Sequence, residues 1–412
     1  MYKRQGLHFS PDPSTSNRGN IGGALGNNSC GAHSIIWGKT VDNILEIDSI
    51  LSNGNIAKFG KINTNQIFEK IKNDSLESNI YQAVININSQ YKNEIIKRYP
   101  NIERRVSGYN LDELLDLNKL NMSKFIVGSE GTLTTITQAK IKLVENPKFK
   151  GISLLYFNSL YQALEATVHI LKYEPSAIEL VGNMILTQAK TNIQYSRMLD
   201  FLEGEPESLL IVEMNGETEQ IVHKKLQALK SNIEKTKLTY ATQIFTKSKD
   251  QSKIWAIRKA GLGLMMNVPG PAKPIPFVED TAVSPEKLPE FTMEFDKIIK
   301  NHETIAGYYG HAGAGCLHIR PLIDLKTNSG VQKMESISKE ISDLVIKYNG
   351  SMSGEHGDGL ARSMWNKKLF GEQIYSAFQI VKNAFDPESI MNPGKIINSE
   401  NCLLYTSPSP RD

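Results

Sequence analysis

The sequence predicts an α+β protein with two domains, and three observations support this. The chain has 412 residues, a length typical of two or three domains. Strand-like alternation and turn signals occur in the first third, around residues 43–59 and 125–143. Beyond Asn146-Pro147, strand-like and amphipathic helical segments alternate. We therefore expect a domain boundary near Pro147, with enough apolar residues on each side for a core.

The first domain is predicted to contain loops, a hairpin and a long helix. Residues 19–38 are dense in Gly, Asn and Ser, which predicts tight loops whose backbone N–H groups can face an anion or a flat ring. The turn signal Asn53-Gly54 joins predicted strands at 43–51 and 56–59. A helix is expected over 66–99. Residues 125–143 predict a strand, a Gly-Ser-Glu-Gly turn and a half-buried strand.

The second domain is predicted from alternating periodicities. Apolar runs or alternation predict strands at 151–157, 208–214 and 304–309. Helical periodicity predicts helices at 159–172, 218–235, 255–266, 285–301, 331–348 and 371–385. Pro387 and the Asn392-Pro393-Gly394 turn end the last helix.

Composition excludes several classes of protein. The net charge is +3 and there is no basic stripe with interleaved aromatics, which excludes nucleic acid as a partner. Three widely spaced cysteines form no CxxC pair and favour a reducing compartment. No segment has the length and apolarity of a membrane span, and no signal peptide is visible. We expect a cytoplasmic protein, with peripheral attachment at the inner face of a membrane as the alternative.

Both termini differ in composition from the Lys-, Asn- and Ile-rich chain between them. Residues 399–412 resemble translated sequencing-adapter read-through, and residues 1–5 resemble the same artefact. We expect both to be foreign and leave them out of the fold prediction. Native disordered termini are the alternative. The chain would then be an internal fragment of a longer protein.

Two glycine-rich blocks near the C-terminal end indicate chemistry. Residues 310–318 (Gly-His-Ala-Gly-Ala-Gly-Cys-Leu-His) and 354–359 (Gly-Glu-His-Gly-Asp-Gly) hold His311, His318, Glu355 and His356. Two imidazoles and a carboxylate form a common ligand set for a catalytic divalent metal, which leaves His356 free to move protons. Structural histidines beside an ordinary glycine turn are the alternative.

Several motifs, taken in the order of the chain, resemble a known family. Residues 22–43 and 128–133 resemble the flavin-binding segments of vanillyl-alcohol oxidase type flavoproteins. The two histidine blocks and residues 385–395 resemble FAD-linked D-2-hydroxyacid dehydrogenases, the group of D-lactate dehydrogenase and the glycolate oxidase flavoprotein subunit. The residue sequence of these motifs is most similar to that of long family members that are fused to an iron–sulfur module.

The resemblance implies a domain plan. Residues 6–147 would form a truncated vanillyl-alcohol oxidase type FAD-binding domain that lacks its N-terminal subdomain, including the glycine-rich pyrophosphate hairpin. Residues 148–370 would form a ferredoxin-like, antiparallel-sheet substrate (cap) domain with the metal site. Residues 371–398 would return to the FAD domain as a helix.

The resemblance also implies cofactors and site residues. FAD and a divalent metal, Zn or Mn, are expected, with His311, His318 and Glu355 as metal ligands. The flavin contacts would be Gly22, Gly23, Asn28, Ser29, Gly31, Ala32, Gly38, Asp42, Gly128, Ser129, Glu130, Gly131, Asn392 and Lys395. Asp42 is expected to cap or anchor its loop.

The implied reaction oxidises a D-2-hydroxy acid (D-lactate, glycolate or D-2-hydroxyglutarate) to the 2-oxo acid. His356 would be the base and Arg258 would bind the substrate carboxylate. In an extended segment neighbouring side chains point to opposite sides, so Glu355 would face the metal and His356 the substrate. Further candidates for substrate contact or support are Arg320, Asp280, Asp358 and Arg362.

Electrons would pass to an iron–sulfur protein or fused iron–sulfur domain, or to a quinone. Two other functions stay open at this point. A flavin-free metallohydrolase would explain the metal set but not residues 22–42 and 128–133. An inert fragment without bound FAD would follow from the missing hairpin.

Overall fold

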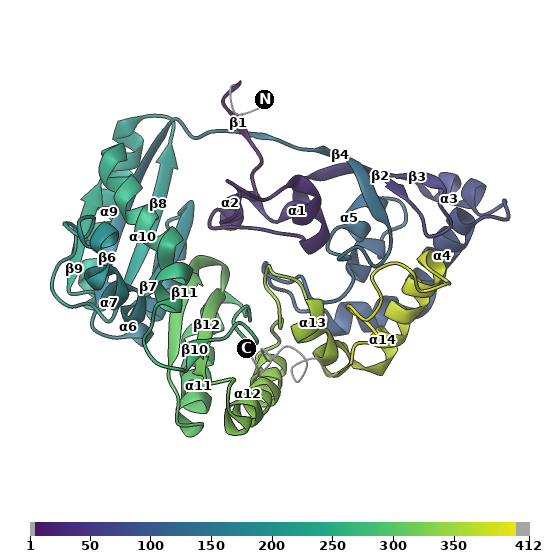
Figure 1. Cartoon of the computed structure of the whole chain (residues 1–412). Coiled ribbons are helices and arrows are strands. Elements are labelled where there is room, and N and C mark those ends of the chain that lie inside the picture. Colours follow the sequence, from purple (N-terminus) through teal and green to yellow (C-terminus); the bar gives the residue numbers. More distant parts are fainter. Residues whose placement is uncertain (1–4, 401–412) are drawn as a thin grey trace.

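The computed structural model describes residues 5–400, which form two lobes (Figure 1). The terminal segments expected to be foreign lie outside the described residues, except for residues 5, 399 and 400. The first lobe is built from residues 5–143 and from the chain that follows residue 365. The second lobe is built from residues 146–365. Along the described chain, no helix combines the length and the apolarity needed to cross a membrane.

A three-stranded antiparallel sheet lies in the first lobe, with the order β3 (Ile56–Phe59), β2 (Ile44–Ile50), β4 (Thr135–Ile141). The hairpin predicted around Asn53-Gly54 is confirmed: Ile50 pairs with Ile56, and Gly54 has a φ of 84°. A short pair, β1 (Leu7–His8) with β5 (Val144–Glu145), links the start of the described chain to the boundary between the lobes.

The helices of the first lobe correct two predictions. The expected helix over 66–99 is two helices, α3 (Thr64–Lys70) and α4 (Leu76–Arg98), because Ser75 starts the second by accepting a hydrogen bond from Ser78 N. Phe125 lies in α5 (Met122–Ile126), not in a strand. The last helix, α14 (Asn366–Phe385), packs its apolar side against α4 and completes the core of this lobe (Figure 1).

The glycine-rich stretch 19–38, expected to form loops, contains two short helices, α1 (Ile21–Asn27) and α2 (Ser34–Trp37). Asn20 starts α1 because its side-chain oxygen accepts a hydrogen bond from Gly23 N at 2.7 Å. Gly38 ends α2 with a φ of 69°, a conformation that favours glycine. Both helices face the gap between the lobes in Figure 1.

The second lobe contains a seven-stranded antiparallel sheet with the order β10-β12-β11-β7-β8-β6-β9. Four of these strands have the ferredoxin-like order β9-β6-β8-β7, formed by a β-α-β-β-α-β unit. The unit comprises β6 (Phe149–Phe157), α6 (Leu160–Leu171), β7 (Ala177–Gly182), β8 (Ser208–Gly216), α9 (Glu219–Thr236) and β9 (Ala241–Phe245). Strands β7 and β9 were not predicted; β7 is buried along its whole length, so it shows no alternation.

Helices cover both faces of this sheet. Strand β8 shows the division: Leu210 and Val212 pack in the core beneath α6 and α9, whereas Leu209 and Ile211 pack in the core beneath α7 and α10. The remaining elements are α7 (Asn183–Thr191), α8 (Ile193–Ser196), α10 (Ser248–Met266), β10 (Lys273–Pro274), α11 (Leu288–Asn301), β11 (Ala306–His311), β12 (Cys316–Ile323), α12 (Asn328–Lys347) and α13 (Gly359–Arg362).

A buried ionic cluster joins the lobes. His33 precedes α2, and its Nε2 lies 3.0 Å from Glu213 Oε1 on β8, while its Nδ1 lies 3.3 Å from Asp12. Glu213 also accepts hydrogen bonds from Trp255 Nε1 and Ser176 Oγ, at 3.2 and 3.1 Å. The imidazole of His33 is therefore held between the carboxylate of Asp12, in the first lobe, and that of Glu213, in the second.

This cluster predicts a pH-dependent stability. Burial alone lowers the pKa of His33, but Asp12 and Glu213 outweigh it and raise the pKa from 6.5 to about 9. A raised folded-state pKa means that the stabilisation is fully present below pH 6.5 and is lost as the pH rises through about 9. We expect the free energy of unfolding, measured with urea, to be lower at about pH 9.5 than at about pH 6 by of the order of 1–3 kcal/mol. In His33→Gln this difference should be absent. Equal losses in both proteins would contradict this.

Candidate functional site

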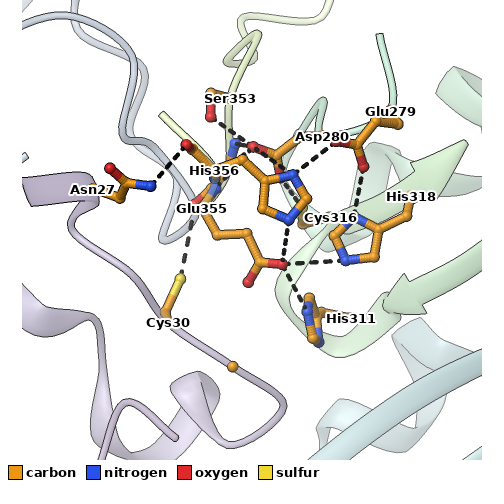
Figure 2. A network of polar contacts seen from close by, with 12 residues as sticks. Asn27, Cys30, Glu279, Asp280, His311, Cys316, His318, Ser353, Glu355 and His356 are labelled. Carbon is orange, nitrogen blue, oxygen red and sulfur yellow. Dashed lines mark hydrogen bonds and ion pairs between the residues drawn. The ribbon is translucent and has the colours of Figure 1, made fainter. Parts of the chain in front are cut away.

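Three imidazoles surround one carboxylate oxygen where the lobes meet (Figure 2). Glu355 Oε1 lies 3.3 Å from His311 Nε2, 3.2 Å from His318 Nε2 and 3.2 Å from His356 Nε2. The rings of His318 and His356 stack with their centroids 5.1 Å apart. The four residues predicted from the two glycine-rich blocks therefore form one cluster.

The sheet of the second lobe positions the first two imidazoles. Tyr309 on β11 pairs with His318 on β12, and His311 lies two residues beyond Tyr309 on the same face. His311 and His318 are thus diagonal neighbours on the sheet face that α7 and α10 cover. Their side chains are only 7% and 6% exposed, which fixes both rings in place.

A buried aspartate positions the other two residues. Asp280 Oδ2 accepts hydrogen bonds from the backbone N–H groups of Gly354, Glu355 and His356 at 3.1, 3.1 and 2.8 Å, and from Ser353 Oγ at 2.6 Å. Successive N–H groups that converge on one oxygen curl the segment into an anion-binding nest.

This curl corrects one prediction. Glu355 and His356 were expected to point to opposite sides of an extended segment. The segment is bent instead, and the two side chains converge so that His356 Nε2 lies 3.2 Å from Glu355 Oε1. The expectation failed because alternation applies to strands, and the nest around Asp280 removes the strand geometry here.

Two acidic residues that the sequence analysis did not identify hold the outer nitrogens of the imidazoles. His311 Nδ1 lies 2.7 Å from Glu179 Oε1 on β7. Glu279 Oε1 lies 2.8 Å from His356 Nδ1, and its Oε2 lies 3.3 Å from His318 Nδ1. A carboxylate at Nδ1 turns Nε2 toward the centre and raises its basicity, as in carboxylate–histidine–metal triads. The available signal was an acidic residue inside an otherwise apolar run, such as Glu179 in Ala177–Gly182.

Among the described residues, the possible ligand atoms that all lie within 4.8 Å of one another are those of Asp280, His318, Glu355 and His356. This set contains two of the three predicted ligands and leaves out His311. We favour His311 over Asp280 as a ligand for a physical reason. The Asp280 oxygen already accepts four hydrogen bonds, whereas His311 Nε2 points at Glu355 Oε1.

The charges of the cluster are strongly coupled. Burial raises the pKa of Glu355, but His311 and Arg104 outweigh it and hold the pKa well below its usual range. Burial lowers the pKa of His356, yet Asp280 and Glu279 hold it well above its usual range. His356 is also the most accessible of the three imidazoles, with 38% of its side chain exposed. It is therefore the ring that a ligand can reach.

Arginines surround the same centre. Arg258 on α10 contacts Glu179 Oε2 through Nε at 2.7 Å and through Nη2 at 2.6 Å, so one edge of its guanidinium is occupied. Arg320 and Arg362 lie 3.4 and 3.1 Å from Glu279, and the Nε of each is buried without a partner in the described chain. Asp358 lies in the same region and accepts a hydrogen bond from Gly108 N.

The two predicted flavin segments lie side by side in the first lobe. Gly128 N donates to Leu25 O at 2.8 Å, and Glu130 N donates to Gly26 O at 2.9 Å. Asn392 Nδ2 donates to Glu130 O at 2.7 Å, which brings the C-terminal segment to the same place. Lys395 Nζ donates a hydrogen bond to the nearby Pro393 O at 3.2 Å.

Several features of these segments fit a bound ligand. Asn28 Oδ1 accepts from Val41 N, but its Nδ2 is buried without a partner in the described chain. Gly22 is exposed, and a Cβ there would only touch Asn20 at 3.6 Å, so the chain itself does not demand glycine. Asp42 accepts from Lys39 N at 2.8 Å, which agrees with a capping role. The other predicted flavin contacts lie in the same two segments: Gly23, Ser29, Gly31, Ala32, Gly38, Ser129 and Gly131.

With this fold and site, the chain belongs to the family of FAD linked oxidases. Residues 146–396 match the family described as "FAD linked oxidases, C-terminal domain", and residues 2–60 match "FAD binding domain".

Among curated proteins, the chain is 33% identical to the D-2-hydroxyglutarate dehydrogenase of Haemophilus influenzae over 99% of this chain and 41% of the relative. It is 26% identical to the D-lactate dehydrogenase of Archaeoglobus fulgidus over 96% of this chain and 73% of the relative. The chain thus spans about two fifths of the length of the first of these relatives.

Among solved structures, p-cresol methylhydroxylase matches with a TM-score of 0.61 and 10% identity, over 96% of this chain and 72% of that protein. This likeness confirms the predicted fold class, the FAD-binding architecture of the vanillyl-alcohol oxidase type with its antiparallel-sheet domain.

The outer carboxylates generate a test of the cluster as a metal site. We expect Glu179→Gln to lower the affinity for Zn²⁺ or Mn²⁺ by about 10–100-fold, because His311 loses the charge that supports it. Titration with a competing fluorescent chelator measures this, with thermal melting as a check on folding. The exposed Glu388→Gln serves as the matched control. An unchanged affinity in Glu179→Gln would argue against the cluster as a metal site.

Proposed function

We propose that the chain carries out the FAD-linked oxidation of a D-2-hydroxy acid to the 2-oxo acid, with D-2-hydroxyglutarate as the first substrate to test. One observation supports this most strongly: the three imidazoles and Glu355 converge where the flavin segments of the first lobe meet the sheet of the second. The names of the relatives and the family membership agree with it.

In this proposal His311, His318 and Glu355 hold a divalent metal, Zn or Mn. The fit rests on three Nε2 atoms that face one carboxylate oxygen, with carboxylates at the Nδ1 atoms behind them. Such a cation, when bound, supplies Lewis-acid polarisation of the substrate hydroxyl and carboxylate.

His356 is proposed as the base. Its Nε2 faces the centre, and the exposed side of its ring admits a substrate. The raised pKa of His356 would be lowered again by a divalent cation held beside the ring, so that Nε2 could accept the hydroxyl proton, and Glu279 at Nδ1 would stabilise the imidazolium that forms. FAD, when bound to the segments at 22–42 and 128–131, supplies the acceptor for the hydride from the substrate Cα.

Two arginines are proposed to bind carboxylates of the substrate. Arg258 has one edge held by Glu179, which orients the remaining Nη1. Arg320 follows His318 by two residues on β12 and so lies on the same face of the sheet. A substrate with two carboxylates, such as D-2-hydroxyglutarate, would use both cations.

The rest of the pathway is proposed from the resemblance. Electrons would leave the flavin for an iron–sulfur protein or domain, or for a quinone. The protein would work in the cytoplasm or at the inner face of a membrane.

The proposed function has a direct test. The purified chain is loaded with FAD and Zn²⁺ or Mn²⁺, and the flavin absorbance is followed without oxygen after D-2-hydroxyglutarate, D-lactate or glycolate is added. Bleaching of the flavin band supports the proposal. Bound metal without bound flavin would favour the metallohydrolase, and a chain that binds neither would be the inert fragment.

His356→Ala tests the base. We expect flavin reduction to fall by about 10²–10⁴-fold, the usual range for loss of a general base. Metal affinity should stay close to that of the unchanged protein, since His356 is not among the proposed ligands. Normal reduction would exclude the role as base, and a metal-free variant would make His356 a ligand.

Arg320→Gln tests the second carboxylate. We expect kcat/KM for D-2-hydroxyglutarate to fall by about 10–100-fold, because a charge-assisted hydrogen bond is lost. D-lactate, which has no second carboxylate, is the internal control and should change little. An equal loss for both substrates would show that Arg320 only supports Glu279.

A further inference from the structure

We propose that Arg104 is the positioning residue that fixes the Glu355 carboxylate and couples it to the flavin segment of the first lobe. The inference rests on the proposed function, because it concerns the same metal centre. It adds a residue from the first lobe to a cluster otherwise built from the second. The sequence analysis gave no sign of it, since Arg104 stands outside every motif.

Arg104 is fully buried and uses its guanidinium on two lobes at once. Nη1 donates to Glu355 Oε2 at 2.6 Å. Toward the flavin segment, Nη1 lies 2.8 Å from Cys30 Sγ, Nη2 donates to Gly31 O at 2.5 Å and Nε donates to Ser34 Oγ at 3.1 Å. A planar fork of fixed geometry can meet such a set, whereas a single ammonium cannot.

The two oxygens of the Glu355 carboxylate have different partners. Arg104 holds Oε2, and Oε1 faces the three imidazoles. The terminal torsion of a glutamate is broad, so without Arg104 the carboxylate could rotate and present either oxygen, or neither, to the centre. Holding one oxygen therefore pre-organises the other as a ligand.

The same contacts connect the centre to the flavin segment. Besides the Arg104 bonds, Asn27 Nδ2 donates to His356 O at 3.3 Å, and Cys30 Sγ lies 3.8 Å from Gly354 O. A ligand that orders residues 27–34 would thus also order Glu355. Because such coupling is reciprocal, FAD and the metal should each raise the affinity for the other.

The experiment measures metal affinity, not turnover. Zn²⁺ and Mn²⁺ affinities are determined by chelator competition in the purified chain, with and without FAD, for the unchanged protein and for Arg104→Met, Arg104→Lys and Ser34→Ala. Arg105→Lys is the matched control, because Arg105 is also buried but pairs with Asp112, away from the centre. Thermal melting reports folding.

We expect Arg104→Met to weaken metal binding by about 10–100-fold, the range for loss of an outer-shell partner. Arg104→Lys should recover most of this affinity, because it restores a cation near Oε2. In the unchanged protein FAD should tighten metal binding at least about 5-fold. Arg104→Lys and Ser34→Ala should lose that effect, and Arg105→Lys should keep both properties.

Unchanged metal affinity in Arg104→Met, or no effect of FAD on metal affinity in the unchanged protein, would overturn the inference. If Arg104→Met does not fold, Arg104→Lys and Ser34→Ala decide it. A protein that binds no metal in any form would overturn the proposed metal centre itself, which is a distinct failure.

Discussion

The site depends on one buried carboxylate, that of Asp280. Its Oδ2 accepts hydrogen bonds from the backbone N–H groups of residues 354–356 and from the hydroxyl of Ser353, and this bend brings Glu355 and His356 to the same side of the chain. A buried anion without these donors would cost several kcal/mol, so the loop and the aspartate stabilise each other. The imidazoles on the sheet then face a carboxylate that is already in position.

Charge balance explains why so many ionic groups can be buried together. Four carboxylates, of Glu179, Glu279, Asp280 and Glu355, lie among arginines and imidazoles that compensate them. Burial alone would protonate such carboxylates, yet the pKa values of Glu179 and Glu279 are held below their usual range by their cationic neighbours. The carboxylates of Glu179 and Glu279 contact the Nδ1 atoms of the imidazoles, whereas the ring of His356 is the one exposed to solvent.

Much of this could be predicted from local patterns. Helical periodicity with a capping residue located α6 and α9, where Ser159 and Thr218 accept the first backbone hydrogen bonds. The glycine-rich blocks located the imidazoles. Glu179 has a local signal, an acidic side chain inside an apolar run, but the roles of Glu179, Glu279 and Arg104 could not be predicted this way. They depend on partners such as His311, His356 and Glu355, which are 132, 77 and 251 residues distant in the chain. The curl at 354–356 was missed for the same reason: its cause is Asp280, 74 to 76 residues earlier.

The placement of α14 also has a consequence for biosynthesis. The core of the first lobe contains Phe370, Phe378 and Phe385 together with residues between Leu25 and Leu133, so the entire second lobe is inserted between its two halves. On a ribosome that adds about 5–20 residues per second, roughly 10–50 s pass between the synthesis of the N-terminal half of the first lobe and that of α14. The second lobe is continuous in sequence and can close its own core during that time. We therefore expect the inserted lobe to fold first, while the sheet and α4 of the first lobe stay exposed to chaperones.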